Sequence, residues 1–328
     1  MKAITLREAG GADALIMSEI EEPVLAPGEV LIRTQASGLN GADLLQRRGL
    51  YPPPKGASPL IGLEVSGTIE KMHLGADKSG FHIGDPVMAL LSGGGYAEKV
   101  AIRHDQIMRV PRNIPLIEAC GITEVFVTAY LELVILGHLQ KGERLLIHAG
   151  ASGVGTAAIQ IAKNIGAEIW VTAGSDEKLG FCKELGAHHL INYKSESFAE
   201  RILTDTDKRG VNCILDLVGA SHFPANLEAL ALDGRILHVG LSGGTKTELD
   251  LRLLLAKRAS LIGSTLRSRS YEEKAEIIKK FWAYAEQKFI TGEFHPVIDK
   301  VFAAKDVKDA HLYMESQKNR GKILLKWS

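Results

Sequence analysis

The segment 148–155, HAGASGVG, is the first part of the chain whose residue types and spacing indicate a chemical task. Gly150 and Gly155 occupy the outer positions of a G-x-G-x-x-G pattern, and Ser152 occupies the middle one. An apolar run precedes the segment and a helical pattern follows it. In such a turn small residues let a pyrophosphate approach the backbone, and the free N–H groups of the next helix attract its charge. This context favours dinucleotide binding over a purely structural turn.

A second segment, VTAGSDEK at 171–178, bears on which dinucleotide is bound. NAD enzymes place an acidic residue about 20 residues beyond the glycines, where it binds the ribose 2′-hydroxyl. This chain has no charge at 173–175, whereas the Ser175 hydroxyl and Lys178 can reach a 2′-phosphate, and Tyr193 follows the next strand. Asp176 is the competing feature, although an acid at a helix start also complements the helix dipole. We therefore expect NADP(H) rather than NAD.

The elements that must position these residues alternate regularly after residue 140. Strand-like runs such as RLLIHAG, EIWVTAG and VNCILDLVG are separated by helical patterns that end at Gly166 and Gly186. Strands that are apolar on both faces and separated by helices belong in a parallel sheet covered on both sides. The fold class expected here is therefore α/β, with a doubly wound sheet.

The chain before residue 125 has a different character. Runs rich in Val and Ile, such as GEVLIRTQASG and EVSGTIEKM, alternate with Gly and Pro, which indicates a β-rich domain with irregular turns. The segment 51–59, YPPPKGASP, is expected to be an extended loop because its prolines fit neither a helix nor a central strand.

Composition excludes several classes of protein. The 328 residues include 39 Lys+Arg and 39 Asp+Glu, so the formal net charge is zero, which gives no general attraction to nucleic acid or an anionic membrane. No apolar run reaches the length of a membrane span, and the N-terminus lacks a signal-peptide core, so we expect a soluble cytoplasmic protein. The three cysteines are far apart, which argues against a disulfide framework or a thiolate zinc site.

Taken together, the β-rich first part, the doubly wound second part and the helical return resemble medium-chain dehydrogenases/reductases along the whole chain. Zinc members of that family carry a cysteine ligand near the stretch GLNGAD and a His-Glu pair near GLE. Asn40 and Leu63 stand at those positions, and SGGGYAEKVAIR runs on without the four-cysteine lobe. Asparagine and leucine cannot replace thiolate and imidazole as zinc ligands. The resemblance is therefore to the zinc-independent quinone oxidoreductase branch, and no metal is expected.

The resemblance implies a domain division and a set of site residues. It predicts a GroES-like catalytic domain at 1–124 and 267–328, and a Rossmann NADP-binding domain at 125–266. It also predicts that Asn40 and Tyr51 flank the nicotinamide and the quinone. The remaining residues expected to line the cofactor are Thr128, Ser152, Gly153, Val154, Gly174, Ser175, Lys178, Tyr193, Val218, Gly240, Leu241, Leu266, Asn319 and Lys322. Other roles stay open: Tyr51 can brace the proline loop, Thr128 can bond its own helix, and Asn319 can be a turn residue.

The activity implied is hydride transfer from NADPH to a quinone, with Tyr51 and Asn40 as hydrogen-bond donors to the acceptor oxygen. The alternative is reduction of an activated C=C bond in an enone or enal, for which Tyr51 could supply the proton. Some relatives act as crystallins or bind AU-rich RNA, but the zero net charge argues against nucleic acid as the main partner. The family usually forms homodimers through the Rossmann sheet edge, which here is 259–266, ASLIGSTL.

Overall fold

The computed structural model describes residues 1–76 and 80–327 and contains two compact units. Unit 1 comprises Met1–Val127 and Leu266–Ser328, and unit 2 comprises Thr128–Thr265. The boundaries that we expected from the sequence fall after residues 124 and 266, against 127 and 265 in the structure.

Unit 2 is built on a six-stranded sheet in which every neighbouring pair is parallel. Its strands lie in the order β10-β9-β8-β11-β12-β13, which is 3-2-1-4-5-6 when they are counted along the chain. This is the dinucleotide-binding order, in which ligands lie at the carboxyl ends of the strands where the order reverses. The strands are β8 (Arg144–Ile147), β9 (Glu168–Ala173), β10 (His189–Asn192), β11 (Val211–Asp216), β12 (Leu230–His238) and β13 (Ser260–Gly263).

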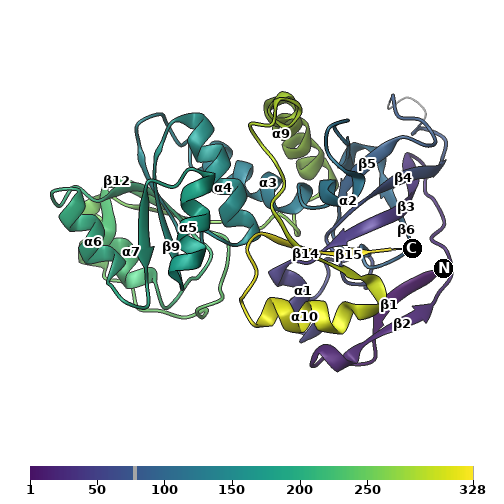
Figure 1. Cartoon of the computed structure of the whole chain (residues 1–328), viewed down its shortest axis with the longest axis horizontal. Coiled ribbons are helices and arrows are strands. Elements are labelled where there is room, and N and C mark those ends of the chain that lie inside the picture. The colour runs from purple at the N-terminus through teal and green to yellow at the C-terminus, as the bar shows by residue number, and fades with distance from the viewer. Residues whose placement is uncertain (77–79, 328) are drawn as a thin grey trace. The chain divides into compact units, whose positions relative to one another are not determined.

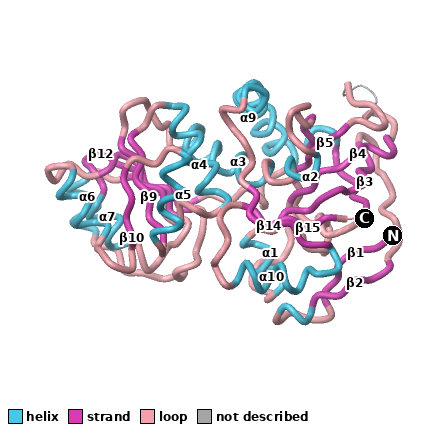
Figure 2. The backbone as a smooth tube through the Cα atoms, in the orientation of Figure 1, coloured by secondary structure: helices cyan, strands magenta, loops and turns pink. Residues whose placement is uncertain are grey.

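Helices cover both faces of this sheet, as a doubly wound topology requires. Figures 1 and 2 show α4 and α5 together on one face and α6 and α7 together on the other. The core between the sheet and the α6–α7 layer contains fully buried apolar side chains, among them Leu146 and Ile214 of the sheet and Ile202 of α6. The helical elements are η4 (Leu131–Leu136), α4 (Gly153–Ile165), α5 (Asp176–Leu185), α6 (Phe198–Asp205), α7 (Phe223–Ala229) and α8 (Leu251–Lys257). The predicted α/β fold with a doubly wound sheet is confirmed.

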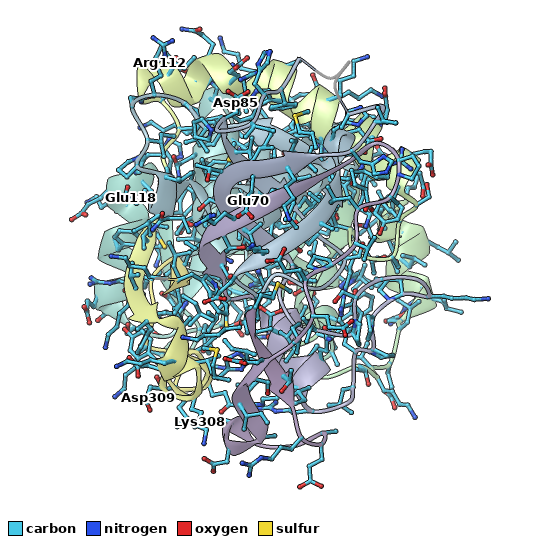
Figure 3. All side chains as sticks on the ribbon, turned by 90° about the vertical axis from the view of Figure 1, so that its right-hand side faces the viewer. Glu70, Asp85, Arg112, Glu118, Lys308 and Asp309 are labelled. Atoms are coloured by element: carbon cyan, nitrogen blue, oxygen red, sulfur yellow. The ribbon has the colours of Figure 1, made fainter. Side chains whose placement is uncertain are left out.

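Unit 1 is β-rich, and its main sheet has seven strands in the order β14-β15-β3-β4-β5-β7, with β6 paired to β3. Every pair is antiparallel except β14 with β15. The strands are β1 (Lys2–Leu6), β2 (Leu15–Glu19), β3 (Glu29–Gly38), β4 (Glu64–Met72), β5 (Pro86–Leu90), β6 (Lys99–Arg103), β7 (Ile107–Arg109), β14 (Ile298–Ala303) and β15 (Lys322–Lys326). In Figure 3 the labelled residue Glu70 of β4 lies over this sheet.

The helices of unit 1 include one that the sequence does not signal. Helix α1 (Gly41–Arg47) turns Asp43, Gln46 and Arg47 inward, so its buried face is polar and gives no apolar periodicity. The other helical elements are η1 (Ala12–Ala14), η3 (His104–Gln106), α2 (Leu116–Ala119), α9 (Tyr271–Thr291), η5 (Ala304–Asp306) and α10 (Val307–Glu315). Helix α3 (Thr123–Tyr130) begins in unit 1 and ends in unit 2.

Two further findings concern the whole described chain. None of its described helices is both long enough and apolar enough to cross a bilayer. Cys120, Cys182 and Cys213 are all buried and free.

Candidate functional site

The glycine turn between β8 and α4 packs closely against the chain's own backbone because its residues are small. A Cβ atom on Gly155 would lie 2.5 Å from the carbonyl oxygens of Ala149 and Gly150, and one on Gly150 would lie 2.9 Å from Val171 Cβ. Ala149, not a glycine, takes the left-handed conformation of the turn, with φ of 51°. Ser152 begins α4 as its N-cap, and its Oγ accepts the Gly155 N–H at 3.1 Å. The predicted residues Gly153 and Val154 form the first turn of this helix.

The turn between β9 and α5 carries the second predicted group. Ser175 is the N-cap of α5, and its Oγ accepts the Lys178 N–H at 3.4 Å, which brings both residues to the helix N-terminus. A Cβ on Gly174 would lie 2.8 Å from the hydroxyl oxygen of Tyr193 and 3.1 Å from Lys194 Cε. The structure therefore brings Gly174, Ser175, Lys178 and Tyr193 together, and it adds Lys194, which the sequence reading overlooked.

Asp176, the competing acid, is engaged elsewhere. Its Oδ1 accepts a hydrogen bond from Asn192 Nδ2 at 2.9 Å, at the end of the neighbouring strand β10. Asp176 is the first residue of α5, where a negative charge is favourable next to the helix N-terminus. Its carboxylate therefore has a structural partner.

The loops after β11 and β12 place a third group at the same edge of the sheet. Asp216 ends β11, and its Oδ1 accepts the N–H groups of Val218 at 2.8 Å and Gly219 at 2.9 Å. Burial alone would raise the pKa of Asp216, but hydrogen bonds from His238 and these N–H groups hold it below its usual range. A Cβ on Gly219 would lie 3.1 Å from Leu241 Cδ2 and 3.2 Å from the Gly240 oxygen. The predicted residues Val218, Gly240 and Leu241 are therefore neighbours.

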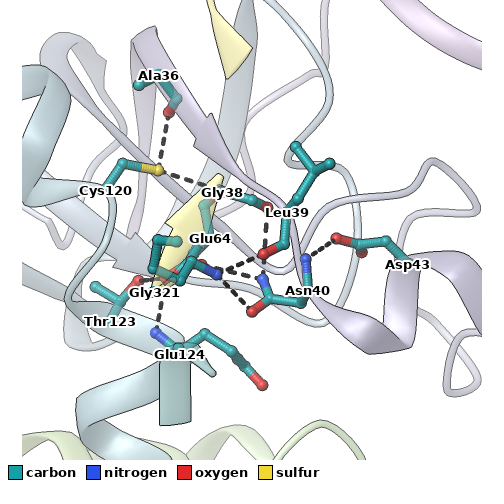
Figure 4. A network of polar contacts seen from close by, with 12 residues as sticks. Ala36, Gly38, Leu39, Asn40, Asp43, Glu64, Cys120, Thr123, Glu124 and Gly321 are labelled. Atoms are coloured by element: carbon teal, nitrogen blue, oxygen red, sulfur yellow. Dashed lines mark hydrogen bonds and ion pairs between the residues drawn. The ribbon is translucent and has the colours of Figure 1, made fainter. Parts of the chain in front are cut away.

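Unit 1 contains a buried polar network around Glu64, drawn in Figure 4. Lys322 Nζ lies 2.6 Å from Glu64 Oε1 and also donates to Asn40 Oδ1 at 2.7 Å and to the Leu39 carbonyl at 2.6 Å. Asn40 Nδ2 donates to Glu64 Oε1 at 3.0 Å. Glu64 is fully buried and Lys322 is 3% exposed, so each charge depends on the other. Lys322 and Asn40, predicted separately to line the cofactor, are thus brought together inside this unit.

The second oxygen of Glu64 fixes the start of helix α3. Thr123 Oγ1 donates to Glu64 Oε2 at 2.9 Å, and the Glu124 N–H donates to the same oxygen at 2.8 Å. A Cβ on Gly38 would lie 2.3 Å from Glu64 Oε1, so the end of β3 must be glycine for the carboxylate to sit there. The sequence marks Glu64 only through the stretch GLE.

Tyr51 lies against a buried arginine that the sequence reading did not single out. The guanidinium of Arg267 stands 5.0 Å from the centre of the Tyr51 ring and donates to the Tyr51 carbonyl at 3.1 Å. Arg267 also donates to the Ser92 carbonyl at 2.9 Å, and Lys274 Nζ contacts Ser92 Oγ. Both cations are at most 4% exposed, and neither forms an ion pair with a carboxylate in the described part of unit 1. Arg267 braces Tyr51 directly, and nothing in LRSRS signals that burial.

A polar chain behind α1 supports the same region. Arg47 contacts His311 Nδ1 at 3.3 Å, His311 Nε2 contacts the Tyr96 hydroxyl at 3.1 Å, and Tyr96 donates to Asp43 Oδ2 at 3.2 Å. Asp43 Oδ2 also accepts the Asn40 N–H at 2.7 Å. Burial raises the pKa of Asp43 to about 7 and lowers the pKa of His311 to about 3. The neutral imidazole of His311 is therefore linked through the Tyr96 hydroxyl to the Asp43 carboxyl, which accepts the backbone N–H of Asn40.

The three remaining predicted residues are placed separately from these groups. Thr128 is 6% exposed in helix α3 and is the first residue of unit 2. Leu266 is buried in unit 1. Asn319 Nδ2 donates to the Gly321 carbonyl at 2.9 Å, so Asn319 braces the turn before β15.

Two family models match the chain and correspond to its two units. The alcohol dehydrogenase GroES-like domain matches residues 26–112, and the zinc-binding dehydrogenase model matches residues 153–282. Quinone oxidoreductase-like protein 2 of Bos taurus is 32% identical over 312 residues, which are 95% of this chain and 88% of the relative. The chain belongs to the medium-chain dehydrogenase/reductase superfamily. The family predicted from the sequence is confirmed.

Solved structures of similar proteins agree with membership of this superfamily. CurK enoyl reductase is 29% identical, with a TM-score of 0.88 over 100% of this chain and 99% of that one. A mycobacterial protein complexed with NADPH is 28% identical, with a TM-score of 0.91 over 99% of this chain and 100% of that one. This medium-chain dehydrogenase/reductase is therefore an oxidoreductase with a nucleotide-binding fold.

Among the described residues, no cluster of three His, Cys, Asp or Glu side chains has the arrangement of a metal site. The expectation that no metal takes part in the reaction stays a prediction, which rests on Asn40 and Leu63.

Proposed function

We propose that this chain is an NADPH-dependent reductase that transfers a hydride to a quinone. The observation that carries the proposal is the carboxyl edge of the unit 2 sheet, where small residues form the turn before α4, and Ser175, Lys178 and Tyr193 lie at the turn before α5. Gly150 and Gly155 let β8 and α4 pack closely, since a Cβ atom at either position would meet the chain's own atoms, and the turn leads into the N-terminus of α4, where this fold holds a pyrophosphate. Bound NADPH supplies the hydride from its reduced nicotinamide.

The preference for NADPH over NADH rests on the turn between β9 and α5. Lys178 and Lys194 bring two cations to this turn, and the Ser175 hydroxyl adds a donor. Asp176 could repel a 2′-phosphate, but its carboxylate is bonded to Asn192. The proposal therefore assigns the 2′-phosphate to Ser175, Lys178 and Tyr193, with Lys194 as an additional cation.

The test compares the two cofactors with wild-type protein and with Lys178→Ala. A hydrogen bond to a charged group contributes about 1.5–3 kcal/mol, so the variant should raise KM for NADPH by roughly tenfold or more and leave KM for NADH unchanged. Lys183→Ala is the matched control, since it removes an exposed lysine from the last turn of the same helix. A wild-type protein with lower KM and higher kcat for NADH would refute the NADPH assignment.

The acceptor is assigned to Tyr51. Its hydroxyl makes no hydrogen bond to any described residue, and burial raises its pKa, so the group stays a protonated donor at neutral pH. The Asn40 amide, by contrast, is already bonded to Glu64 and Lys322. We propose that Asn40 orients the acceptor region, whereas Tyr51 donates to the acceptor oxygen as negative charge develops there. Tyr51→Phe should lower kcat/KM for 1,2-naphthoquinone and leave NADPH binding unchanged; an unchanged kcat/KM would refute the role.

A second candidate function is reduction of an enone or enal, which the likeness to CurK enoyl reductase favours. NADPH consumption with 1,2-naphthoquinone and with an enone separates the two activities. A crystallin-like or RNA-binding role is a third possibility, and a salt-sensitive mobility shift with AU-rich RNA would revive it. The cytoplasmic location expected from the sequence likewise stays a prediction.

A homodimer through the edge of the unit 2 sheet is also part of the proposal. Strand β13 is the last strand of that sheet, and Leu261 on it is 38% exposed, while Leu251 and Leu255 of α8 are 62% and 75% exposed. An unpaired apolar edge is a hazard that proteins cover. Light scattering should give a dimer mass for the wild type and a monomer mass for Leu261→Lys. A monomeric wild type would refute this assembly.

A further inference from the structure

Glu124 is a carboxylic acid in unit 1 whose side chain has no role in the contacts described above or in the proposed function. It is half-buried in the first turn of α3, and only its backbone N–H takes part in the Glu64 network. Figure 4 shows its side chain extending away from the Glu64 carboxylate. The Glu124 carboxyl makes no hydrogen bond to any described residue, although most buried polar groups find a partner.

The position of Glu124 on its helix ties it to a residue expected at the nicotinamide. Thr128 follows four residues later in α3, and side chains at this spacing share one face of a helix. If Thr128 lies beside the nicotinamide, the Glu124 carboxyl lies one helical turn away on the same face. Glu124 is also coupled electrostatically to Tyr51, the residue assigned to the acceptor.

The surroundings of Glu124 keep its carboxyl protonated at neutral pH. Burial, helped by the negative charge of Glu64, raises the pKa of Glu124 to about 8, although Lys322 and Lys274 oppose the shift. The charged and titratable groups that act on it or respond to it come from six places in unit 1: Asp43 of α1, Tyr51 and Arg267 of two loops, Glu64 of β4, Lys274 of α9 and Lys322 of β15. Two acids, three cations and a phenol therefore face this carboxyl.

Tyr51 is the other possible acid, and the comparison favours Glu124. An efficient general acid has a pKa near the working pH, so that it is protonated at rest and still gives up its proton readily. Burial raises the pKa of Tyr51 above its ordinary value of 10.0, which makes its hydroxyl a good hydrogen-bond donor and a poor acid. Glu124 meets both requirements near pH 7 to 8.

We propose that Glu124 is the proton donor for a second activity of this site, the reduction of an α,β-unsaturated ketone or aldehyde. This inference rests on the proposed function, because it takes NADPH as the hydride source. Tyr51 donates to the carbonyl oxygen of the acceptor as negative charge forms there, and Arg267, which lies 5.0 Å from the centre of the Tyr51 ring, holds Tyr51 in place.

The atoms and electrons balance in this reaction. The β carbon of the acceptor gains the hydride and its electron pair, and the C=C π pair moves toward the carbonyl to give an enolate. The O–H bond of Glu124 then breaks, and its proton forms a C–H bond at the α carbon. The products are a saturated carbonyl compound and the oxidised cofactor, and the Glu124 carboxylate regains a proton from water. A quinone needs this acid less, because its reduced oxygens take protons from solvent.

The test uses wild-type protein, Glu124→Gln, Glu124→Asp and the control Glu118→Gln. Glu118 is exposed on α2 and points outward in Figure 3, so its substitution repeats the chemical change away from Glu124. NADPH oxidation is measured from pH 6 to 10 with 2-cyclohexenone and with 1,2-naphthoquinone. Fluorescence titration gives the Kd for NADPH, and infrared difference spectra of wild type minus Glu124→Gln report the protonated carboxyl directly.

For the enone, wild-type kcat should fall with rising pH through about 8, because activity needs the protonated form of Glu124. Glu124→Gln should lower the enone kcat by about 100-fold or more and abolish this alkaline decline, since general acids contribute roughly 10²–10⁴. Glu124→Asp should retain a decline, the quinone kcat should change less than tenfold, and the Kd for NADPH should stay within twofold. The infrared carboxyl band should be present at pH 7 and absent at pH 10.

Two results would overturn the proposal while leaving the proposed function intact. One is a wild type that reduces the quinone but not the enone. The other is a Glu124→Gln protein that keeps the enone kcat and its alkaline decline. A wild-type protein that oxidises NADPH with neither acceptor would instead refute the proposed function itself.

Discussion

The ion pair between Lys322 and Glu64 should be one of the most sensitive points of unit 1. At an effective dielectric constant of 20, two charges 2.6 Å apart attract by about 6 kcal/mol, but removing both from water costs several kcal/mol for each ion. The intact pair is therefore close to neutral for stability. Lys322→Met keeps the length of the side chain and removes the ammonium, which leaves the fully buried Glu64 charge uncompensated. We expect a loss of about 3–5 kcal/mol in the free energy of unfolding.

Urea unfolding followed by tryptophan fluorescence and circular dichroism measures this loss. Lys326→Met is the matched control, because Lys326 lies on the same strand β15 and is exposed, and it should change stability by less than about 0.5 kcal/mol. The double variant Glu64→Gln/Lys322→Met should be less destabilised than the sum of its single variants by about 1–3 kcal/mol, since its partners are in contact. A Lys322→Met loss below about 1 kcal/mol, or additive single losses, would refute the reasoning.

Two further predictions concern the same unit. Gly38→Ala should cost about 1–3 kcal/mol and lower Tm, because its new Cβ would lie 2.3 Å from Glu64 Oε1, whereas Gly41→Ala has open space; equal Tm values for the two variants would contradict this. The pKa of Asp43 is raised by burial to about 7, so the stability that its neutral form contributes is present at low pH and is lost as pH rises through 7. The unfolded form loses this proton near pH 4 and the folded form near pH 7, so the Tm of Asp43→Asn should fall less than the wild-type Tm between about pH 4 and 7, and parallel Tm curves would exclude the effect.

The sequence was most informative where local signals carry the structure. The glycines at 150 and 155, and the strand and helix patterns after residue 140, predict the parallel sheet. They do so because the apolar residues of each segment follow the spacing typical of a strand or of a helix. Ser175 and Lys178 are predicted at one turn because they lie three residues apart in the sequence, just after the second strand, and the structure places both at the start of α5. Asp176 is the feature of the sequence that competes with an NADPH preference. Its partner, Asn192, belongs to the next strand and is visible only in the structure.

The parts that escaped prediction depend on distant residues. Lys322 pairs with Glu64, which lies 258 residues earlier in the chain, and no local pattern predicts a buried lysine. Arg267 and Lys274 resemble solvated surface charges in LRSRS and EEKAEII, but unit 1 buries both. The inward face of α1 is polar, so an amphipathic pattern could not reveal it.

Glu64 links the architecture of unit 1 to the acidity proposed for Glu124. One of its oxygens holds Lys322 and Asn40, and the other holds the backbone at the start of α3. Its negative charge is also the second largest cause, after burial, that raises the pKa of Glu124. Glu64→Gln removes that charge and leaves the Lys322 ammonium uncompensated, and both changes favour the ionised form of Glu124.

The alkaline decline of enone reduction should therefore move below pH 8 in Glu64→Gln, although the variant keeps the Glu124 side chain. Activity is measured on the fraction that remains folded, as judged by circular dichroism at each pH, so that lost stability is not read as lost acidity. A decline that stays at the wild-type pH would show that Glu64 fixes the start of α3 but does not raise the pKa of Glu124. A decline that moves down in Glu64→Gln and is absent in Glu124→Gln would identify Glu124 as the titrating group, because only a charge acting on that carboxyl predicts both.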